Sequence, residues 1–173
     1  SHVAMSIWKE AGTSSKPVLV SWSMVKPNVA RVSAELSLET VKSGLAVSYT
    51  VFGNGEVVVS YDFKAAGGGL LDLPRVGMQL QIPAVFDQME WFGPGPYETY
   101  WDRHKGSAVG LYSRSVKKDF FQYVRPQESN NHWAARWIKL TNSAGDGIII
   151  KGDVPLSMSA WPYVMQDLET AQH

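Results

Sequence analysis

Apolar and polar side chains alternate over much of the chain, and a period of two along a sequence predicts β-strands. The clearest stretch is 30–38, where alanine, valine and leucine at the even positions alternate with arginine, serine and glutamate at the odd positions. The same kind of alternation predicts further strands over 18–25, 45–52, 56–63 and 76–82. These stretches are expected to pair as half-buried, antiparallel strands.

The turn at Gly53-Asn54-Gly55 decides how two of these strands pair. A two-residue Asn-Gly turn would set Val51 opposite Val58 and would place other apolar residues opposite polar ones. A three-residue loop sets apolar residues opposite one another throughout: Val51–Val57, Tyr49–Val59, Val47–Tyr61 and Leu45–Phe63. Because apolar cross-strand pairs stabilise a sheet, the sequence predicts the three-residue loop, with Gly55 in the left-handed region.

The second half of the chain carries shorter strand patterns, separated by irregular stretches. Strands are predicted over 85–91, 107–115, 132–140, 148–151 and 154–159. The longest gap between them, which includes residues 120–131, has no period and predicts an irregular connection.

Helix is predicted only near the two ends. Residues 7–12 are typical of the end of a helix, with Gly12 as its C-terminal cap, and Pro162 suits the first turn of a helix over 163–171. With about ten strands and so little helix, the sequence predicts an all-β fold. The expected architecture is a large antiparallel two-sheet sandwich in which residues 1–173 form a single domain.

Composition narrows the function classes. Sixteen basic residues balance sixteen acidic ones, so the chain lacks the positive charge that nucleic acid or an anionic membrane would attract. There is no cysteine, which excludes disulfides, thiolate catalysis and cysteine-ligated zinc. The apolar runs are too short to span a membrane. None of this separates a cytoplasmic from a periplasmic location.

Residues 91–103, Trp-Phe-Gly-Pro-Gly-Pro-Tyr-Glu-Thr-Tyr-Trp-Asp-Arg, form the most unusual stretch. Pro94 and Pro96 donate no backbone hydrogen bond, so the stretch is expected to be neither a helix nor a central strand. Its aromatic side chains predict an ordered, largely buried loop. Arg103 is then expected to form a buried ion pair with Glu98, Asp102 or Glu128, and residues 126–128 are the expected neighbour.

The same stretch and two others resemble a known family. Trp-x-Gly-x-Gly-Pro-x-Glu-x-Tyr-x-Asp-Arg at 91–103 is preceded by Pro-Arg-Val-Gly at 74–77 and followed by Tyr-Val-Arg-Pro-Gln-Glu at 123–128. In this order they resemble the C-terminal β-sandwich domain, or small chain, of glycoside hydrolase family 2 β-galactosidases, from about Trp8 to His173. The residues that carry the resemblance are Arg75, Trp91, Gly93, Gly95, Pro96, Glu98, Tyr100, Asp102, Arg103, Tyr123, Pro126, Glu128, Asn131, His132 and Arg136.

The sequence departs from the family pattern at one point. Ser129 and Asn130 stand where the family usually has Asn-Gly. Asn130 is able to adopt the left-handed conformation that the glycine would have held.

The resemblance implies a fold and a function. The fold would be the supersandwich shared with galactose mutarotases, incomplete here at both ends, so that sheet edges or apolar surface should be exposed. The parent protein would hydrolyse terminal β-galactosides with retention, using glutamates of a barrel domain that this chain does not contain. The chain would then be an inactive structural segment. Its partners would be the other domains of the parent, a galactoside or galactose bound through the parent, and further copies in a homo-oligomer. Mg²⁺ or Na⁺ would lie in the catalytic domain, with no metal or other cofactor on this segment.

Three other functions are weighed against that one. Glu98, Asp102 and Glu128 lie on loops and could supply the two carboxylates of a glycosidase, but the resemblance disfavours a catalytic pair here. Exposed tryptophans, such as Trp101, Trp133 or Trp161, could make the chain a carbohydrate-binding module, although packing is the favoured role. His104 or His132 with Glu128 could act as in an aldose epimerase, although a surface or hydrogen-bonded histidine is the favoured role for His132.

A calcium site is the remaining alternative. Asn142, Asp146 and Asp153 could supply oxygen ligands, yet residues 141–147 are more typical of a hairpin turn. No metal ligand is therefore predicted.

Overall fold

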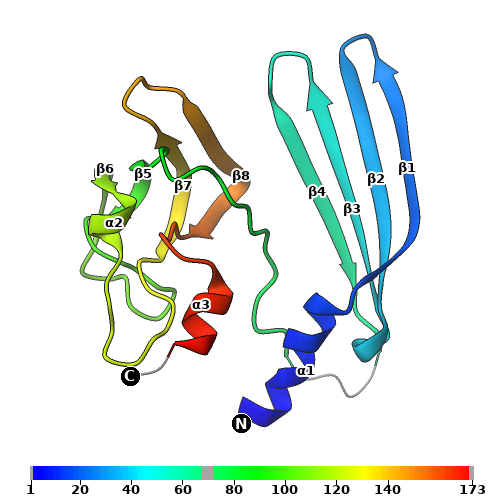
Figure 1. The fold of residues 1–173 in the computed structure, drawn as a ribbon, viewed down its shortest axis with the longest axis horizontal. Coiled ribbons are helices and arrows are strands. Elements are labelled where there is room, and N and C mark those ends of the chain that lie inside the picture. The colour runs from blue at the N-terminus through cyan, green and yellow to red at the C-terminus, as the bar shows by residue number, and fades with distance from the viewer. Residues whose placement is uncertain (1, 68–71, 172–173) are drawn as a thin grey trace. The chain divides into compact units, whose positions relative to one another are not determined.

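The computed structural model describes residues 2–67 and 72–171, which form two compact units, one up to Gln79 and one from Leu80 onward (Figure 1). Each unit contains one four-stranded antiparallel sheet. The predicted all-β, antiparallel class is therefore confirmed. The assignment of residues 1–173 to a single domain stays a prediction.

The sheet of the first unit follows the order of its strands along the chain, β1-β2-β3-β4. Its elements are β1 (Lys16–Lys26), β2 (Val29–Leu38), β3 (Ser43–Phe52) and β4 (Val57–Lys64), with the 3₁₀ helix η1 (Glu39–Val41) between β2 and β3. All four strands predicted by alternation in this part of the chain are present. Each is joined to the next by a short turn, so every pairing is local in sequence.

The β3–β4 hairpin has the predicted register. Val51 pairs with Val57, Val47 with Tyr61 and Leu45 with Phe63. Gly55 has a φ of 89°, in the left-handed region that the bulged three-residue loop requires. The prediction from apolar pairing is confirmed.

The two faces of this sheet differ sharply in polarity. The register places most of the apolar residues of the four strands on one face, among them Val20, Trp22, Met24, Ala30, Val32, Ala34, Leu36, Leu45, Val47, Tyr49, Val51, Val57, Val59, Tyr61 and Phe63. Serines, threonine and charged residues occupy most of the other face. Trp22, at 74% exposure, is the most open member of the apolar face. The predicted exposed apolar surface is thus present, while its attribution to missing segments stays a prediction.

Helix α1 (His2–Thr13) covers one end of the apolar face. Ala11 packs with Leu38 and Val41 in a small buried cluster, and Trp8 meets the ring of Phe63 edge-on at 6.1 Å between centroids. The prediction of Gly12 as a C-terminal cap is wrong, because the helix continues to Thr13 and the hydroxyl of Ser14 closes it by donating to the carbonyl of Glu10 at 2.7 Å.

The second unit has a non-sequential strand order, β6-β5-β7-β8. Its elements are β5 (Gln88–Gly95), β6 (Ala108–Ser115), α2 (Val116–Asp119), β7 (His132–Thr141), β8 (Gly147–Met158) and α3 (Met165–Thr170). The core lies on one side of this sheet and consists of Met89, Trp91, Val116, Ala135, Ile138, Leu140 and Met158. The strands predicted over 107–115 and 132–140 are confirmed as β6 and β7.

Other predictions for this part of the chain need correction. Residues 76–82 belong to no strand, since alternation gives a segment two faces but does not supply a neighbouring strand. The two short strands predicted over 148–159 are one strand, β8, with register shifts opposite β7. Helix α3 begins at Met165, later than predicted, and Pro162 precedes it.

The expectation that residues 91–103 contain no central strand is also wrong. Strand β5 runs to Gly95 and lies between β6 and β7. Pro94 is tolerated because the pairing of β5 with β7 stops at Phe92, so Pro94 has a paired strand on one side only, and Pro96 lies beyond the end of β5. Gly93 is required for close packing: a Cβ there would lie 2.9 Å from the Cα of Ala135.

Candidate functional site

The chain turns sharply after β5. Residues 100–103 form a tight turn, in which the N–H of Tyr100 and the N–H of Arg103 each donate to the other residue's carbonyl, at 3.2 and 3.0 Å. Trp91 and Thr99 are fully buried, but Tyr97 and Trp101 are 68% and 76% exposed. The prediction of a largely buried loop is therefore correct only in part, because exposed and buried residues are interspersed along it.

Glu98 ties this turn to the long connection between α2 and β7. Its Oε1 accepts hydrogen bonds from the hydroxyl of Tyr123 and, at 3.1 Å, from Nη2 of Arg103. Its Oε2 accepts the backbone N–H of Asn130 at 2.8 Å. Arg103 thus pairs with one of the three predicted carboxylates, but the prediction of a buried pair is wrong, because the Arg103 side chain is 58% exposed.

A shallow hollow of about 200 Å³ lies beside Glu98. It is lined by Tyr100, Arg103, Tyr123, Gln127 and Glu128, and we call it the Tyr100 hollow. The predicted proximity of residues 126–128 to the 91–103 stretch is confirmed by this lining. The guanidinium of Arg103 lies over the ring of Tyr100, 4.3 Å from its centroid.

The electrostatics of the Tyr100 hollow are negative on balance. Burial, and then the charges of Glu98 and Glu128, raise the pKa of Tyr100 to about 12, although Arg103 acts in the opposite direction. The hydrogen bond to Glu98 likewise raises the pKa of Tyr123. Both phenols are therefore neutral at neutral pH, and that of Tyr123 donates to Glu98.

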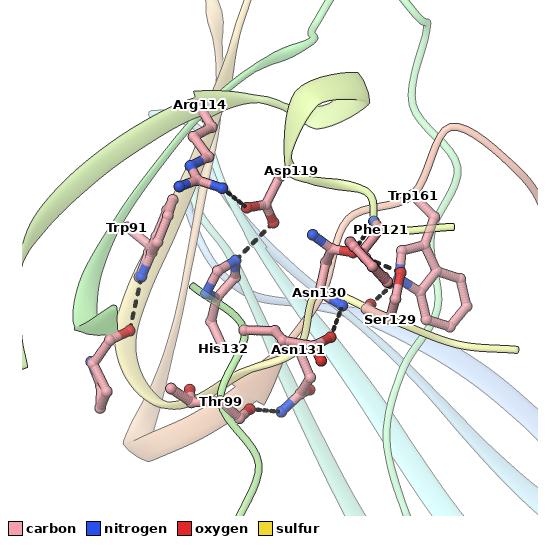
Figure 2. Close-up of polar contacts among 12 residues, drawn as sticks. Trp91, Thr99, Arg114, Asp119, Phe121, Ser129, Asn130, Asn131, His132 and Trp161 are labelled. Carbon is pink, nitrogen blue, oxygen red and sulfur yellow. Dashed lines mark hydrogen bonds and ion pairs between the residues drawn. The ribbon is translucent and has the colours of Figure 1, made fainter. Parts of the chain in front are cut away.

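Hydrogen bonds within the loop before β7, together with one from Trp161, hold the loop in its conformation (Figure 2). Oδ1 of Asn130 accepts the N–H of Phe121 and the hydroxyl of Ser129, each at 2.5 Å. The indole N–H of Trp161 donates to the carbonyl of Ser129 at 2.7 Å. Asn130 has a φ of 60°, so the prediction that it adopts the left-handed conformation is confirmed.

Asn131 and Thr99 join the start of β7 to the chain beyond β5. The N–H of Thr99 donates to the carbonyl of Asn131 at 2.7 Å, and Nδ2 of Asn131 returns a bond to the carbonyl of Thr99 at 2.8 Å (Figure 2). Ala134 then adopts a φ of 56° at a register shift in β7. This irregularity allows His132 and Ala135, three positions apart, both to be fully buried.

His132 lies in the core rather than at an open site. Its Nε2 is 2.9 Å from Oδ2 of Asp119, and its ring lies 4.0 Å from the ring of Trp91. Arg114 approaches the other oxygen of Asp119 at 3.8 Å, so that Asp119 lies between Arg114 and His132 (Figure 2). The prediction of a hydrogen-bonded histidine is confirmed. Complete burial leaves it no access to a sugar, which disfavours the epimerase alternative for His132.

The remaining predicted residues are dispersed. Arg75 lies in the first unit and is exposed, as are Asp102 and Pro96 in the second. Pro126 is half-buried, and the guanidinium of Arg136 lies 5.0 Å from the centroid of the Phe92 ring. A Cβ on Gly95 would lie 2.6 Å from the ring of Tyr112, so its role is close packing.

The three tryptophans considered as sugar-binding surfaces differ in their burial. Trp133 is half-buried with the ring of His104 stacked on it at 4.2 Å, and Trp161 is held through its indole N–H. The favoured packing role is confirmed for both. Trp101 is exposed, and the packing prediction is wrong for it.

Three buried polar residues that complete this arrangement were not predicted: Thr99, Asp119 and Ser129. A single polar residue in an irregular segment produces no period, so its burial has no pattern in the sequence. The four-residue helix α2, which carries Asp119, was missed for the same reason. Its N-terminal cap, where the N–H of Lys118 donates to the hydroxyl of Ser115, was the available signal.

No metal centre is formed by the described residues. Among residues 2–67 and 72–171 there is no group of three or more histidine, aspartate or glutamate side chains that could hold a metal ion. Over the same residues, no helix is long and apolar enough to cross a membrane.

The carboxylates and amides described above thus form hydrogen bonds mainly with loops of the second unit itself. Such contacts are typical of a β-sheet domain whose polar residues stabilise its loops. The chain belongs to the β-galactosidase small chain family: the family model described as "Beta galactosidase small chain" matches residues 1–173. The family predicted from the three motifs is confirmed.

Individual relatives agree with this assignment. The chain is 33% identical to a β-galactosidase of Priestia megaterium over 174 residues and 33% identical to one of Lactobacillus delbrueckii subsp. bulgaricus over 166 residues. These matches cover 99% and 96% of the chain, but only 16% of either relative. A β-galactosidase of Halalkalibacterium halodurans is 35% identical over 73% of the chain and 13% of its own length. The chain therefore spans about a sixth of the relatives it matches over its whole length.

Proposed function

We propose that this chain is a non-catalytic segment of a β-galactosidase, in which it supports the catalytic domain that hydrolyses terminal β-galactosides. The family match and the small share of each relative that the chain spans support this placement. The other domains of the parent would be its partners, and the galactoside would be bound by the parent rather than by this segment alone.

The coordination of Glu98 is the observation that carries the non-catalytic role. A retaining glycosidase needs two carboxyl groups on either side of one bond, one of which donates a proton while the other attacks. Glu98 instead accepts three hydrogen bonds, from Tyr123, Arg103 and the backbone of Asn130. A carboxylate occupied in this way is suited to holding two loops together.

A chimaera tests the supporting role directly. This chain would replace the matching segment in the Priestia megaterium β-galactosidase, and a deletion variant of that enzyme would lack the segment altogether. We expect the chimaera to cleave a chromogenic β-galactoside and the deletion variant to be inactive. An active deletion variant, or a folded but inactive chimaera, would contradict the proposal.

The isolated chain tests the absence of catalysis. We expect no turnover of a chromogenic β-galactoside by the purified chain, because the proposed catalytic residues lie elsewhere. Turnover that is abolished by Glu98→Gln or Glu128→Gln would show that these carboxylates are catalytic and would reject the proposal.

Metal use and assembly are parts of the same proposal. Mg²⁺ or Na⁺ would serve the catalytic domain, and the parent would form a homo-oligomer. Light scattering of the active chimaera would measure its oligomeric state. Removal of metal with a chelator would test whether its activity needs the ion.

A further inference from the structure

The loop at the tip of the β3–β4 hairpin places a glycine directly after an asparagine (Figure 1). Asn54 and Gly55 are both exposed, and Asn54 is the only asparagine of the sequence that a glycine follows. An asparagine side chain can react with its own main chain, because the nitrogen of the next residue is able to attack the side-chain carbonyl carbon and close a cyclic imide. A Cβ on that next residue obstructs the attack, and glycine has none. Residue 55 therefore leaves this reaction sterically open.

A hydrogen bond holds the Asn54 side chain in a suitable direction. Its Oδ1 accepts the N–H of Glu56 at 3.0 Å, which turns the side-chain carbonyl toward the main chain that follows it. The same bond places a donor on the oxygen at which negative charge develops during ring closure. One contact opposes the reaction: the N–H of Gly55 donates to the carbonyl of Phe52 at 3.0 Å. Since exposed loop tips open at little cost in free energy, this bond should slow the attack without preventing it.

Asn142, in the turn between β7 and β8, is a matched comparison. Its Oδ1 accepts the N–H of Ala144 at 2.9 Å, which is the same contact that Asn54 makes with Glu56. The residue that would supply the attacking nitrogen is Ser143, whose side chain obstructs the approach. The two turns therefore share the hydrogen bond and differ in the residue after the asparagine.

We propose that Asn54 is a site of spontaneous modification, at which the chain converts asparagine into a mixture of aspartate and isoaspartate. The nitrogen of Gly55, after losing its proton to hydroxide, forms a bond to Cγ of Asn54. The bond from Cγ to Nδ2 then breaks, and the amide group leaves as ammonia after taking a proton from water. Water opens the cyclic imide at either carbonyl, which gives aspartate or isoaspartate. Water is the only co-reactant, and no group is oxidised or reduced.

The product differs from the encoded loop in length and in charge. Isoaspartate routes the main chain through the side-chain carbons and so adds a methylene group to the loop that sets the β3–β4 register. Either product also places a new carboxylate close to Glu56 in sequence. This chemistry belongs to the hairpin alone and does not rest on the function proposed above.

Peptide mapping of the purified chain tests the proposal. The chain is incubated at mildly alkaline pH, digested with trypsin and analysed by liquid chromatography and mass spectrometry. Cleavage after Lys42 and Lys64 releases residues 43–64, which contain Asn54, and residues 140–151 carry Asn142 as the internal control. We expect the first peptide to show the mass of an amide-to-acid change in two separable forms. It should react about tenfold faster than the control peptide, because only residue 55 lacks a Cβ.

Two variants sharpen the result. Gly55→Ala should slow the reaction at residue 54 by about tenfold, and Ser143→Gly should speed it at Asn142 by a similar factor. Contacts of Asn142 with Asp146 remain in the second variant, so its rate should stay below that of Asn54. The second variant gains a reaction, and the unchanged rate at Asn54 in the same sample shows that the chain is still folded.

Three outcomes would overturn the proposal. These are equal rates at Asn54 and Asn142, an unchanged rate at Asn142 in Ser143→Gly, or a rate at Asn54 that is more than about a hundredfold lower in the folded chain than in urea. The last outcome would show that the bond from Gly55 to Phe52 protects the loop. Because the measurement needs only this chain, its failure leaves the chimaera test of the proposed function unaffected, and an inactive chimaera leaves the mapping result standing.

Discussion

Trp22 and Trp91 are both tryptophans of β-strands, one in each unit, and their surroundings are opposite. Trp22 lies on the apolar face of β1 and is 74% exposed. Trp91 lies in β5 with no exposed surface, its indole N–H donating to the carbonyl of Pro94 at 3.1 Å. The first position follows from alternation along a strand. The second also needs residues distant in sequence, including His132 and Tyr112, to close around it.

Truncation of each tryptophan should show the largest contrast. We expect Trp91→Ala to lower the free energy of unfolding by about 3–5 kcal/mol, because it removes a buried ring and leaves a cavity. The matched change Trp22→Ala should cost less than about 1 kcal/mol. Urea unfolding followed by circular dichroism measures both. An equal cost would mean that the apolar face of the first unit is covered in solution.

Within the second unit, Glu98 is a largely buried hydrogen-bond acceptor and its partner Arg103 is an exposed donor, so the two can be compared by mutation. Glu98→Gln should cost about 1.5–3 kcal/mol, because the Gln amide cannot accept every bond that the carboxylate accepts. Arg103→Ala should cost less than about 1 kcal/mol, since its side chain is 58% exposed. The same unfolding experiment ranks them, and a reversed order would show that the ion pair is buried in solution.

Gly93 lies where a larger side chain would clash with its neighbours, whereas Gly12 lies where there is space for one. Gly93→Ala should destabilise by about 1–3 kcal/mol, because the new methyl would meet the backbone of Ala135 in the packed core. Gly12→Ala is the control in the first unit. It lies in α1 with no atom within 4 Å of an added Cβ, and its substitution should be neutral or stabilise by up to about 1 kcal/mol. Thermal unfolding of the two variants decides, and a stable Gly93→Ala would show that β5 and β7 can move apart.

Gly55 tests the regular unit at a strained glycine turn. Its φ is 89° and nothing lies within 4 Å of an added Cβ, so Gly55→Ala should cost roughly 1 kcal/mol from backbone conformation alone. Gly106→Ala, which also has open space but no positive φ, should be close to neutral. If both variants are equally stable, the hairpin loop has relaxed to another conformation.

A further prediction concerns alkaline pH. Tyr100 has a pKa of about 12 in the folded chain against 10 in the unfolded chain. Between those values the unfolded state loses its proton first, so this residue's contribution to stability is intact below pH 10 and is lost as the pH rises toward 12. Ultraviolet titration of phenolate should show late ionisation that decreases by one tyrosine in Tyr100→Phe, while Tyr123, whose pKa is also raised, still ionises late. An unchanged late amplitude in Tyr100→Phe would assign the step at about pH 12 to another residue.

The sequence predicted the first unit in more detail than the second. Strands 30–38, 45–52 and 56–63 were all found, and the last two were found with their register because the apolar pattern and the turn between them together determine the pairing. The segment 76–82 has the same alternation but no partner strand among the described residues. A period of two shows which side chains share a face of a strand. It does not show which other strand, if any, forms backbone hydrogen bonds with that segment.

At the candidate site the sequence supplied residue identities but not their burial. Glu98, Tyr123 and Glu128 were named from motifs and lie together, and the Arg103–Glu98 pair was among the expected pairs. Asp119 and Thr99 were missed although both are buried, because each depends on a partner more than ten positions away. The position of Pro94 in a central strand was missed because it depends on where the pairing of β5 with β7 stops.

The strand order of the second unit has a consequence for how the chain folds. Neighbouring strands of the first sheet can pair outward from the turns that join them. Strand β5 instead pairs with β7, for example Phe92 with Trp137, although β6, α2 and the long connection separate the two strands along the chain. Closing so large a loop is slow, since its entropy is lost before any contact is gained. Pulse-labelling hydrogen exchange during refolding should therefore protect the amides of β2 and β3 before those of β5 and β7. During that interval the chain would have a formed first sheet and an unformed second sheet. The order of synthesis and capture by chaperones are therefore relevant to this protein.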